Sequence, residues 1–263
     1  MKRDTASING IRMYYELHGS GPHLTLIGGL GTATWLWENN IAALSRYFTV
    51  LAFDNRGAGL SEMPEGPYSI SQMSDDLSGL LSHLNITKTH ILGVSMGGYI
   101  AQEFTLNHPE MVDRLVLVAT TAGRSVAVPM APEVLQLLIT PSEGNVEMMR
   151  EKFRLAFTDA YLDAHLNHLI RLRLETPQPP FAFMAQATAG GDFDRSADIH
   201  QITAPTLAVG ATGDRVILAE NLRLISERIP NSQLIIYNGF AHQFVVENAA
   251  QFNRDIIDFL KKP

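Results

Sequence analysis

The sequence predicts an α/β fold: a mostly parallel eight-stranded sheet with helices on both faces, an N-terminal antiparallel hairpin and an inserted helical cap. Short apolar runs alternate with amphipathic helical patterns along most of the chain, which is typical of parallel strands buried on both faces. This alternation stops after residue 122 and resumes after residue 200, and 263 residues suit one domain with an insertion. We therefore expect a core formed by residues 1–122 and 201–263, and a cap formed by residues 123–200.

The chain opens with the pattern of an antiparallel hairpin. Residues 6–8 and 11–17 are prone to β structure and flank Asn9-Gly10, a dipeptide that suits the two positive φ angles of a tight turn. Six further short apolar runs predict the other strands, at residues 24–27, 49–53, 89–94, 115–119, 206–209 and 234–237.

The most clearly marked helix follows the run at 49–53. Ser69 and Gln72 have the spacing of a capping box. Asp75 and Asp76 fall away from the apolar face, and we expect them to be solvated. The apolar residues that share one face are Ile70, Met73, Leu77, Leu80, Leu81 and Leu84.

Residues 123–200 show helical patterns rich in Leu, Met and Phe. Proline and glycine interrupt them at Pro141, Gly144, Pro177, Pro179, Pro180 and Gly190-Gly191. We expect several helices that close an apolar pocket and exclude water from it, although packing onto the core is the simpler role for most side chains. The apolar residues of this segment include Met148, Met149, Phe153, Phe157, Phe181, Phe183 and Met184.

Composition excludes several classes of protein. Hydrophobic residues make up 46% of the chain and charged residues 18%, as in an ordinary globular protein, and the net charge of −7 argues against a nucleic-acid partner. The absence of cysteine excludes thiol catalysis, disulfides and thiolate metal sites. No run approaches the roughly 20 apolar residues of a membrane span, and no apolar stretch follows the basic N-terminal residues. We expect a cytoplasmic protein without membrane contact, and its oligomeric state stays open.

The segment Gly93-Val94-Ser95-Met96-Gly97 carries the strongest functional signal. The predicted strand at 89–94 precedes Ser95, and a helical pattern follows it, so the serine falls on a tight strand–helix turn. This turn directs the helix N-terminus and the Met96 amide toward an anionic oxygen formed beside Ser95. A glycine-rich turn with an idle serine is the alternative. We interpret Ser95 as a nucleophile.

A serine nucleophile needs a base and a group that orients the base. His242 lies in the loop after the strand at 234–237, and Asp214 lies after the strand at 206–209. Ligand sites of parallel sheets lie beyond the carboxyl ends of the strands, so both residues suit the site. Singly, Asp214 could instead pair with Arg215 at the surface, and His242 could be a solvated loop residue.

Gly28-Gly29-Leu30-Gly31 follows the strand at 24–27. It lacks the glycine spacing of a dinucleotide-binding loop. We expect it to present the Leu30 amide toward Ser95, so that Leu30 and Met96 form a two-donor oxyanion hole. His165 and His168 lie one helical turn apart without an acidic partner at ligand spacing, which favours a polar helix face over a metal site. The predicted chemistry needs no metal and no organic cofactor.

These residues resemble the α/β-hydrolase fold family over almost the whole chain, including the chain order Ser95, Asp214, His242. Several segments are similar to 3-oxoadipate enol-lactonases and related small carboxylesterases: 29–32, 54–61, 68–70, 93–98 and 238–242. The resemblance implies Ser95 as nucleophile, His242 as base, Asp214 as orienting acid, and the Leu30 and Met96 amides as oxyanion donors.

Two further positions bear on this resemblance. Many relatives have His where Gly28 stands, which puts the anchoring of the oxyanion loop in doubt and mildly favours the enol-lactonase branch. Arg124 matches a basic position of enol-lactonase-like chains, which implies contact with a substrate carboxylate; an exposed Arg is the alternative.

We therefore expect a serine hydrolase whose partner is a small-molecule carboxylic ester or lactone. A carbon–carbon bond hydrolase of a dienoic diketone would use the same three residues and stays open. A hydrolase-like ligand receptor with slow turnover is the alternative from another class, although nothing in the cap has the pattern of a docking motif.

Overall fold

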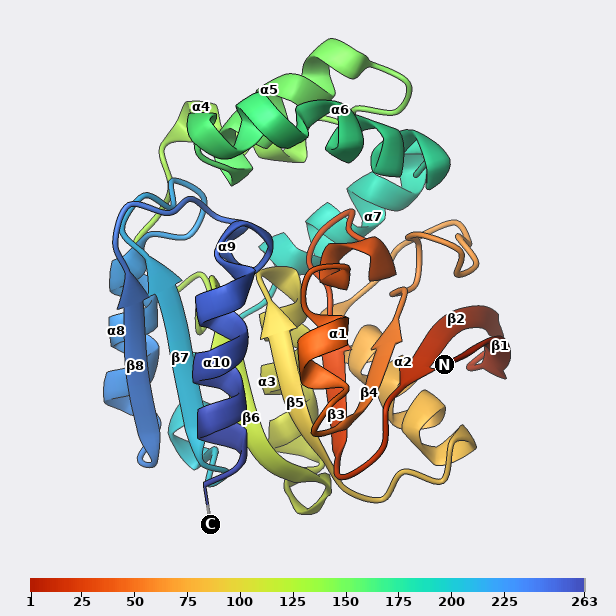
Figure 1. The fold of residues 1–263 in the computed structure, drawn as a ribbon, viewed down its shortest axis with the longest axis vertical. Helices are drawn as coiled ribbons and strands as arrows, with labels where there is room; N and C mark the ends of the chain where they lie inside the picture. The colour runs from red at the N-terminus through yellow and green to blue at the C-terminus, as the bar shows by residue number, and fades with distance from the viewer. Residues whose placement is uncertain (263) are drawn as a thin grey trace.

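The computed structural model describes residues 1–262, and its eight strands form a single sheet in the order β1-β2-β4-β3-β5-β6-β7-β8 (Figure 1). The pairs from β4 to β8 are parallel, whereas β2 is antiparallel to both β1 and β4. The strands are β1 (Lys2–Ile8), β2 (Ile11–His18), β3 (His23–Ile27), β4 (Thr49–Phe53), β5 (Thr89–Val94), β6 (Val112–Val118), β7 (Thr206–Ala211) and β8 (Ser232–Tyr237).

The predicted strands and the N-terminal hairpin are confirmed. Asn9 and Gly10 have φ angles of 46° and 81°, and Ile8 pairs with Ile11 across the turn. The chain runs from β3 outward to β4 and then returns to place β5 on the other side of β3. Ligand sites of open α/β sheets lie at such a reversal of strand order, beyond the carboxyl ends of the strands. The loops after β3 and β5 therefore meet where a site is expected.

Helices cover both faces of the sheet, as predicted (Figure 1). One face packs against α2 (Ile70–His83), α3 (Met96–Asn107) and α8 (Ala219–Arg228). The other packs against α1 (Ile41–Leu44), α9 (Phe244–Glu247) and α10 (Ala249–Leu260). The described residues also form three short 3-10 helices: η1 (Thr34–Trp37), η2 (Pro109–Met111) and η3 (Ile199–Gln201). No helix within residues 1–262 is long and apolar enough to cross a membrane.

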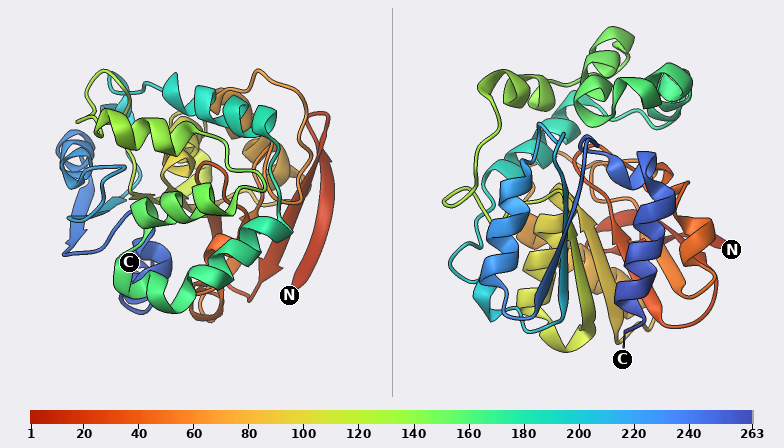
Figure 2. Two further views of the ribbon diagram at one scale, coloured as in Figure 1. Left: turned by 90° about the horizontal axis from the view of Figure 1, so that it is seen from above. Right: turned by 60° about the vertical axis from the view of Figure 1, so that its left-hand side comes forward.

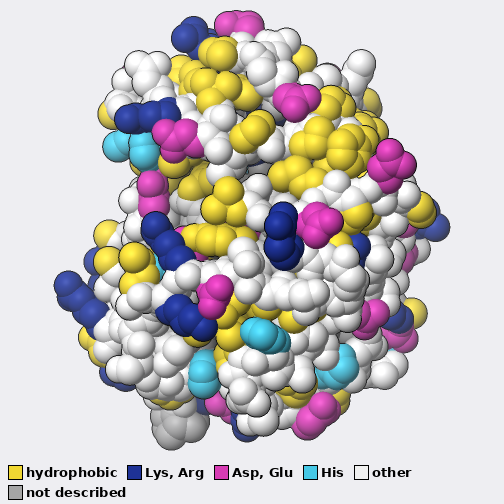
Figure 3. All heavy atoms as spheres, turned by 90° about the vertical axis from the view of Figure 1, so that its right-hand side faces the viewer, with side chains coloured by type: hydrophobic (Ala, Val, Ile, Leu, Met, Phe, Trp, Pro, Cys, Tyr) yellow, Lys and Arg dark blue, Asp and Glu magenta, His cyan; other side chains and the backbone are white. Residues whose placement is uncertain are grey.

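Four helices interrupt the alternation between β6 and β7: α4 (Pro132–Ile139), α5 (Val146–Ala156), α6 (Asp159–Glu175) and α7 (Pro180–Gly191). Figures 1 and 2 show α4, α5 and α6 above the carboxyl ends of the strands, with α7 between them and the sheet. The two ends of this segment lie side by side, because Gly123 and Asp194 form an antiparallel bridge. On the face seen in Figure 3, hydrophobic side chains gather in the upper part of the molecule, where these helices lie.

Helix α2 begins as predicted, since the Ser69 side chain accepts a hydrogen bond from the Gln72 backbone N–H at 3.0 Å. The prediction that Asp76 is solvated was wrong. Asp76 accepts two hydrogen bonds from the Arg56 guanidinium, at 2.8 and 2.9 Å, and both side chains are buried. Periodicity placed Asp76 off the main apolar stripe of α2, but the loop after β4 covers that side of the helix with Arg56.

We expect Asp76→Asn to lower the free energy of unfolding by about 3–5 kcal/mol, because it leaves the Arg56 charge buried without a counter-charge. The neighbouring substitution Asp75→Asn removes the same charge from an exposed position and should change stability by less than about 0.5 kcal/mol. Urea unfolding of the two variants measures the difference. Equal stabilities would show that the Arg56–Asp76 pair contributes nothing to the fold.

Candidate active site

Ser95 lies at a strained turn between β5 and α3. Its φ and ψ angles are 56° and −120°, in a region that residues other than glycine rarely adopt. A Cβ atom on Gly97 would lie 2.2 Å from the Ile27 carbonyl oxygen, so only glycine fits where α3 passes β3. The Ser95 backbone N–H donates to Val118 at 2.9 Å, and the Thr120 hydroxyl donates to the Ser95 carbonyl at 2.9 Å. These contacts with β6 and the residues after it hold the turn in place.

Asp214 and His242 come from the loops after β7 and β8 and meet in the structure. The Asp214 Oδ2 atom lies 2.7 Å from His242 Nδ1. Its Oδ1 atom accepts hydrogen bonds from the backbone N–H groups of Val216 and Ile217, both at 2.8 Å. Asp214 is 2% exposed and His242 5%. Since an ionised carboxylate only accepts hydrogen bonds, Nδ1 is the protonated nitrogen and Nε2 is left to act as a base.

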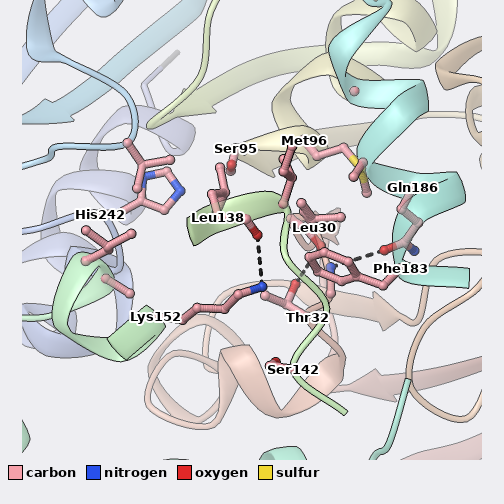
Figure 4. Close-up of a pocket in the computed structure, with 18 of the residues that line it drawn as sticks. Leu30, Thr32, Ser95, Met96, Leu138, Ser142, Lys152, Phe183, Gln186 and His242 are labelled. Carbon is pink, nitrogen blue, oxygen red and sulfur yellow. Dashed lines mark hydrogen bonds between the residues drawn. The ribbon is translucent and has the colours of Figure 1, made fainter. Parts of the chain in front are cut away.

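Ser95 and His242 line one cavity of about 400 Å³, without a hydrogen bond between their side chains (Figure 4). Asp214 lies behind His242, away from the cavity wall. The structure therefore brings together the three residues that the sequence singled out. Hydrogen bonds to a catalytic base are often long without substrate and tighten when substrate binds.

Leu30 and Met96 line the same cavity as Ser95. The loop after β3 passes so close to Ser95 that a Cβ atom on Gly29 would lie 3.1 Å from Ser95 Cβ. The next residue is Leu30, whose backbone N–H forms no hydrogen bond within residues 1–262. Met96 is the first residue of α3, so its N–H has no acceptor in a preceding helical turn. Both N–H groups belong to residues that line the cavity together with Ser95.

Three side chains hold this loop, and sequence reasoning missed all of them. Gln186 on α7 accepts a hydrogen bond from the Gly31 N–H at 3.1 Å, and Arg173 on α6 donates to the Gly31 carbonyl. Asn55, after β4, donates to the Gly28 carbonyl at 3.0 Å. The Gly28 position that lacks the His of many relatives is thus anchored through its carbonyl. No local pattern reveals Gln186, which lies 155 residues from Gly31 in the chain.

Gln186 is completely buried, and both polar atoms of its side-chain amide form hydrogen bonds. Its Nε2 atom donates to the Arg56 carbonyl at 2.7 Å, and its Oε1 atom also accepts from Gln178 at 3.0 Å. Gln178 in turn donates to the Gly57 carbonyl at 2.6 Å. This network joins α7 to the loops after β3 and β4.

The cavity is lined mostly by apolar side chains, many from α4 to α7. Of the apolar residues expected there, Met149, Phe153, Phe157, Phe183 and Met184 line it, whereas Met148 and Phe181 do not. Lys152 is a lining residue that the sequence did not single out, because one lysine among several charged residues of a helix carries no pattern. Burial, reinforced by the nearby Arg173 charge, lowers the pKa of Lys152 to about 7.

Three other candidate residues, Arg124, His165 and His168, are not among those that line the cavity. The Arg124 side chain is 69% exposed, lies 4.0 Å from Asp192 and does not line the cavity. His168 bonds to Glu38 at 2.7 Å, and His165 stacks on the Tyr161 ring. Within residues 1–262, no three His, Cys, Asp or Glu side chains are grouped as ligands of a metal ion.

Comparison with known proteins agrees with this architecture. The family model described as alpha/beta hydrolase fold matches residues 22–249. The chain is 34% identical to a Cupriavidus pinatubonensis protein named 2-hydroxy-6-oxononadienedioate/2-hydroxy-6-oxononatrienedioate hydrolase, over 95% of this chain and 87% of that protein. It is 31% identical to a poly(3-hydroxyalkanoate) depolymerase of Ectopseudomonas oleovorans, over 92% of this chain and 86% of that protein.

A solved structure of another protein has a similar fold. The enol-lactonase from Burkholderia xenovorans LB400 matches with a TM-score of 0.87 and 26% identity, over 98% of this chain and all of that one. The family model and these relatives cover most of the chain. The chain belongs to the alpha/beta hydrolase fold family.

Proposed function

We propose that this protein is a serine hydrolase that cleaves a small carboxylic ester or lactone through an acyl-enzyme on Ser95. The observation that carries the proposal is the Asp214–His242 pair, 2.7 Å apart, in one cavity with a serine on a strained strand–helix turn. The similarity to an enol-lactonase and to a polyester depolymerase supports the ester and lactone class.

The reaction proceeds in two halves. Ser95 Oγ attacks the carbonyl carbon while His242 Nε2 takes its proton, and the oxyanion accepts hydrogen bonds from the Leu30 and Met96 N–H groups. The tetrahedral intermediate then expels the alcohol oxygen, which takes the proton from His242. Water next attacks the acyl-enzyme, giving one proton to His242, and collapse returns that proton to Ser95 as the acid leaves. Asp214 holds the imidazole and stabilises its protonated form.

We propose that residues 123–200 act as a cap in this reaction. Their helices supply most of the apolar cavity wall. An apolar wall lowers the local dielectric constant, which strengthens hydrogen bonds to an oxyanion. Gln186 and Arg173 also connect this segment to the oxyanion loop.

A panel of 4-nitrophenyl esters, lactones and a dienoic diketone tests the proposal. We expect turnover of esters or lactones, and labelling of Ser95 alone by a fluorophosphonate, located by peptide mass spectrometry. Labelling at another serine, or no turnover of any ester or lactone, would contradict the proposal.

Carbon–carbon bond hydrolysis of a dienoic diketone is the second candidate. The 34% identity to the 2-hydroxy-6-oxononadienedioate hydrolase favours it. The same serine, histidine and aspartate would serve both reactions. Fast turnover of the diketone together with negligible turnover of esters and lactones would select this candidate.

Gln186 offers a test of the oxyanion loop. We expect Gln186→Leu to lower kcat about 10- to 100-fold with little change in KM, because the loop loses the acceptor of its Gly31 N–H; complete loss of one oxyanion donor costs about 10²–10³ in kcat. The exposed Gln136 on α4 provides the matched control, and Gln136→Leu should leave kcat unchanged. Steady-state kinetics with one 4-nitrophenyl ester measures both. An unaltered kcat in folded Gln186→Leu would show that the loop keeps its position without this contact.

A further inference from the structure

The charges around the cavity are unbalanced. Among residues 1–262, the cationic side chains of Lys152 and Arg173 line it, and no Asp or Glu does so. The other lining side chains are mostly apolar. A buried charge is costly unless a partner compensates it, so an apolar cavity with two cations and no carboxylate favours an anionic ligand.

Arg173 already has a partner inside the protein. Its guanidinium donates to the Gly31 carbonyl and so helps to hold the oxyanion loop. It also lies close enough to Lys152 to disfavour the charge of that ammonium. A negative charge bound near Lys152 would therefore offset the repulsion between the Arg173 and Lys152 cations.

Lys152 has no charged partner of its own. Its Nζ atom donates to the Leu138 carbonyl at 2.9 Å and lies 4.3 Å from the centre of the Phe183 ring. Both partners are neutral, and an ammonium can donate three hydrogen bonds. Figure 4 shows the side chain reaching into the cavity that Ser95 and His242 also line.

Another cation of α5, Arg154, is placed differently from Lys152. Arg154 lies on the exposed side of the same helix, where it pairs with Glu151. A lysine that served only solubility would be expected on that side. The cation–π contact with Phe183 is a weak attraction, and it does not replace the hydration that the ammonium loses.

We propose that Lys152 binds a carboxylate at the end of the substrate remote from the scissile carbonyl. The preferred substrates are then esters or lactones whose acyl part carries a second, ionised carboxyl group. This assignment rests on the proposed function of Ser95. It also moves the carboxylate-binding role from Arg124, which lies outside the cavity, to a residue inside it.

Two adipate esters test the assignment: 4-nitrophenyl hydrogen adipate, with a free distal carboxyl, and 4-nitrophenyl methyl adipate, in which that carboxyl is methylated. We expect the wild type to favour the free acid about tenfold or more in kcat/KM. Lys152→Met keeps the length of the side chain without its charge, and should reduce this ratio about tenfold, mainly through the KM of the free acid. The loss should be larger for the free acid than for the methyl ester, because the methyl ester has no distal charge for Lys152 to bind.

Two controls separate local from general charge effects. Arg154→Met removes the same charge from the exposed side of α5 and should leave the ratio unchanged. Lys152→Arg keeps the charge and should retain a preference for the free acid. If Lys152→Met does not fold, Lys152→Gln provides the same comparison with a polar side chain.

The pH dependence of the kcat/KM ratio between the free acid and the methyl ester provides a further test. A purely structural role of Lys152 would not make this ratio depend on pH. Because burial lowers the pKa of Lys152 to about 7, the ratio should fall as pH rises through that value. Arg173 on α6, His242 after β8 and Tyr99 on α3 also line the cavity. Arg173 keeps its charge, and the proton transfers through His242 are the same for both esters and cancel in the ratio. Lys152→Arg should give a ratio that is flat to pH 9, since Arg stays charged.

The outcomes separate the two proposals. If the wild type hydrolyses neither ester nor any lactone, the proposed function fails. If it hydrolyses both adipates equally well, or if Lys152→Met keeps the wild-type ratio, the carboxylate site is overturned while the serine hydrolase stands.

Discussion

Ser95→Ala is expected to lower kcat for 4-nitrophenyl acetate by a factor on the order of 10⁵–10⁶, because no other group can form the acyl-enzyme. The fold should persist, since the backbone contacts that hold the turn come from Val118 and Thr120 and do not use the Ser95 hydroxyl. Substrate should still bind, because the lost oxygen bonds to the substrate only during the reaction.

Stopped-flow absorbance at 400 nm, scaled to active sites titrated in the wild type, measures this loss. Ser82→Ala, on the exposed side of α2, is the matched control and should react like the wild type. A Ser95→Ala variant with more than about 1% of wild-type kcat, free of wild-type contamination, would remove Ser95 from the mechanism. Thermal unfolding of both variants checks that a loss of activity is not a loss of fold.

Asp214→Asn is expected to lower kcat about 10⁴-fold. An amide at this position can donate toward Nδ1, which favours the tautomer with its proton on Nε2 and so removes the base. The Oδ1 contacts with Val216 and Ile217 need only an acceptor, which the amide oxygen supplies, so the loop should keep its shape. The effect is therefore chemical rather than structural.

The pH dependence of kcat shows whether Asp214→Asn lowers activity by removing the base or by a general disturbance of the site. At high pH, hydroxide can replace the base, so the deficit of Asp214→Asn should shrink. Asp192→Asn, at an exposed position outside the cavity, should match the wild type at every pH. A loss smaller than tenfold in Asp214→Asn would show that another carboxylate orients His242.

Local patterns in the chain predicted most of the fold. Continuous apolar runs marked the strands because both faces of a parallel sheet are buried, and Asn9-Gly10 marked the hairpin because few other residue pairs adopt its φ angles. Ser69 marked the start of α2 through a contact between residues three apart. Such features depend on neighbours in sequence and can be read without a structure.

Other parts of the site depend on residues far apart in the chain. Asp76 looked solvated because periodicity describes a helix alone, and only packing shows that Arg56 covers it. Gln186 and Arg173 reach Gly31 from helices more than a hundred residues away, so nothing near them in sequence marks their role. Lys152 differs from other lysines only in its surroundings.

The sequence by itself determined the positions of the strands along the chain, the family resemblance, and the candidacy of Ser95, Asp214 and His242, because these follow from residue type and from position after predicted strands. Only the tertiary structure decided which cations enter the cavity and which side chains hold the oxyanion loop. Burial and charge balance are properties of the assembled surroundings. Whether Arg124 or Lys152 faces the cavity is therefore set by how the helices between β6 and β7 pack over the sheet.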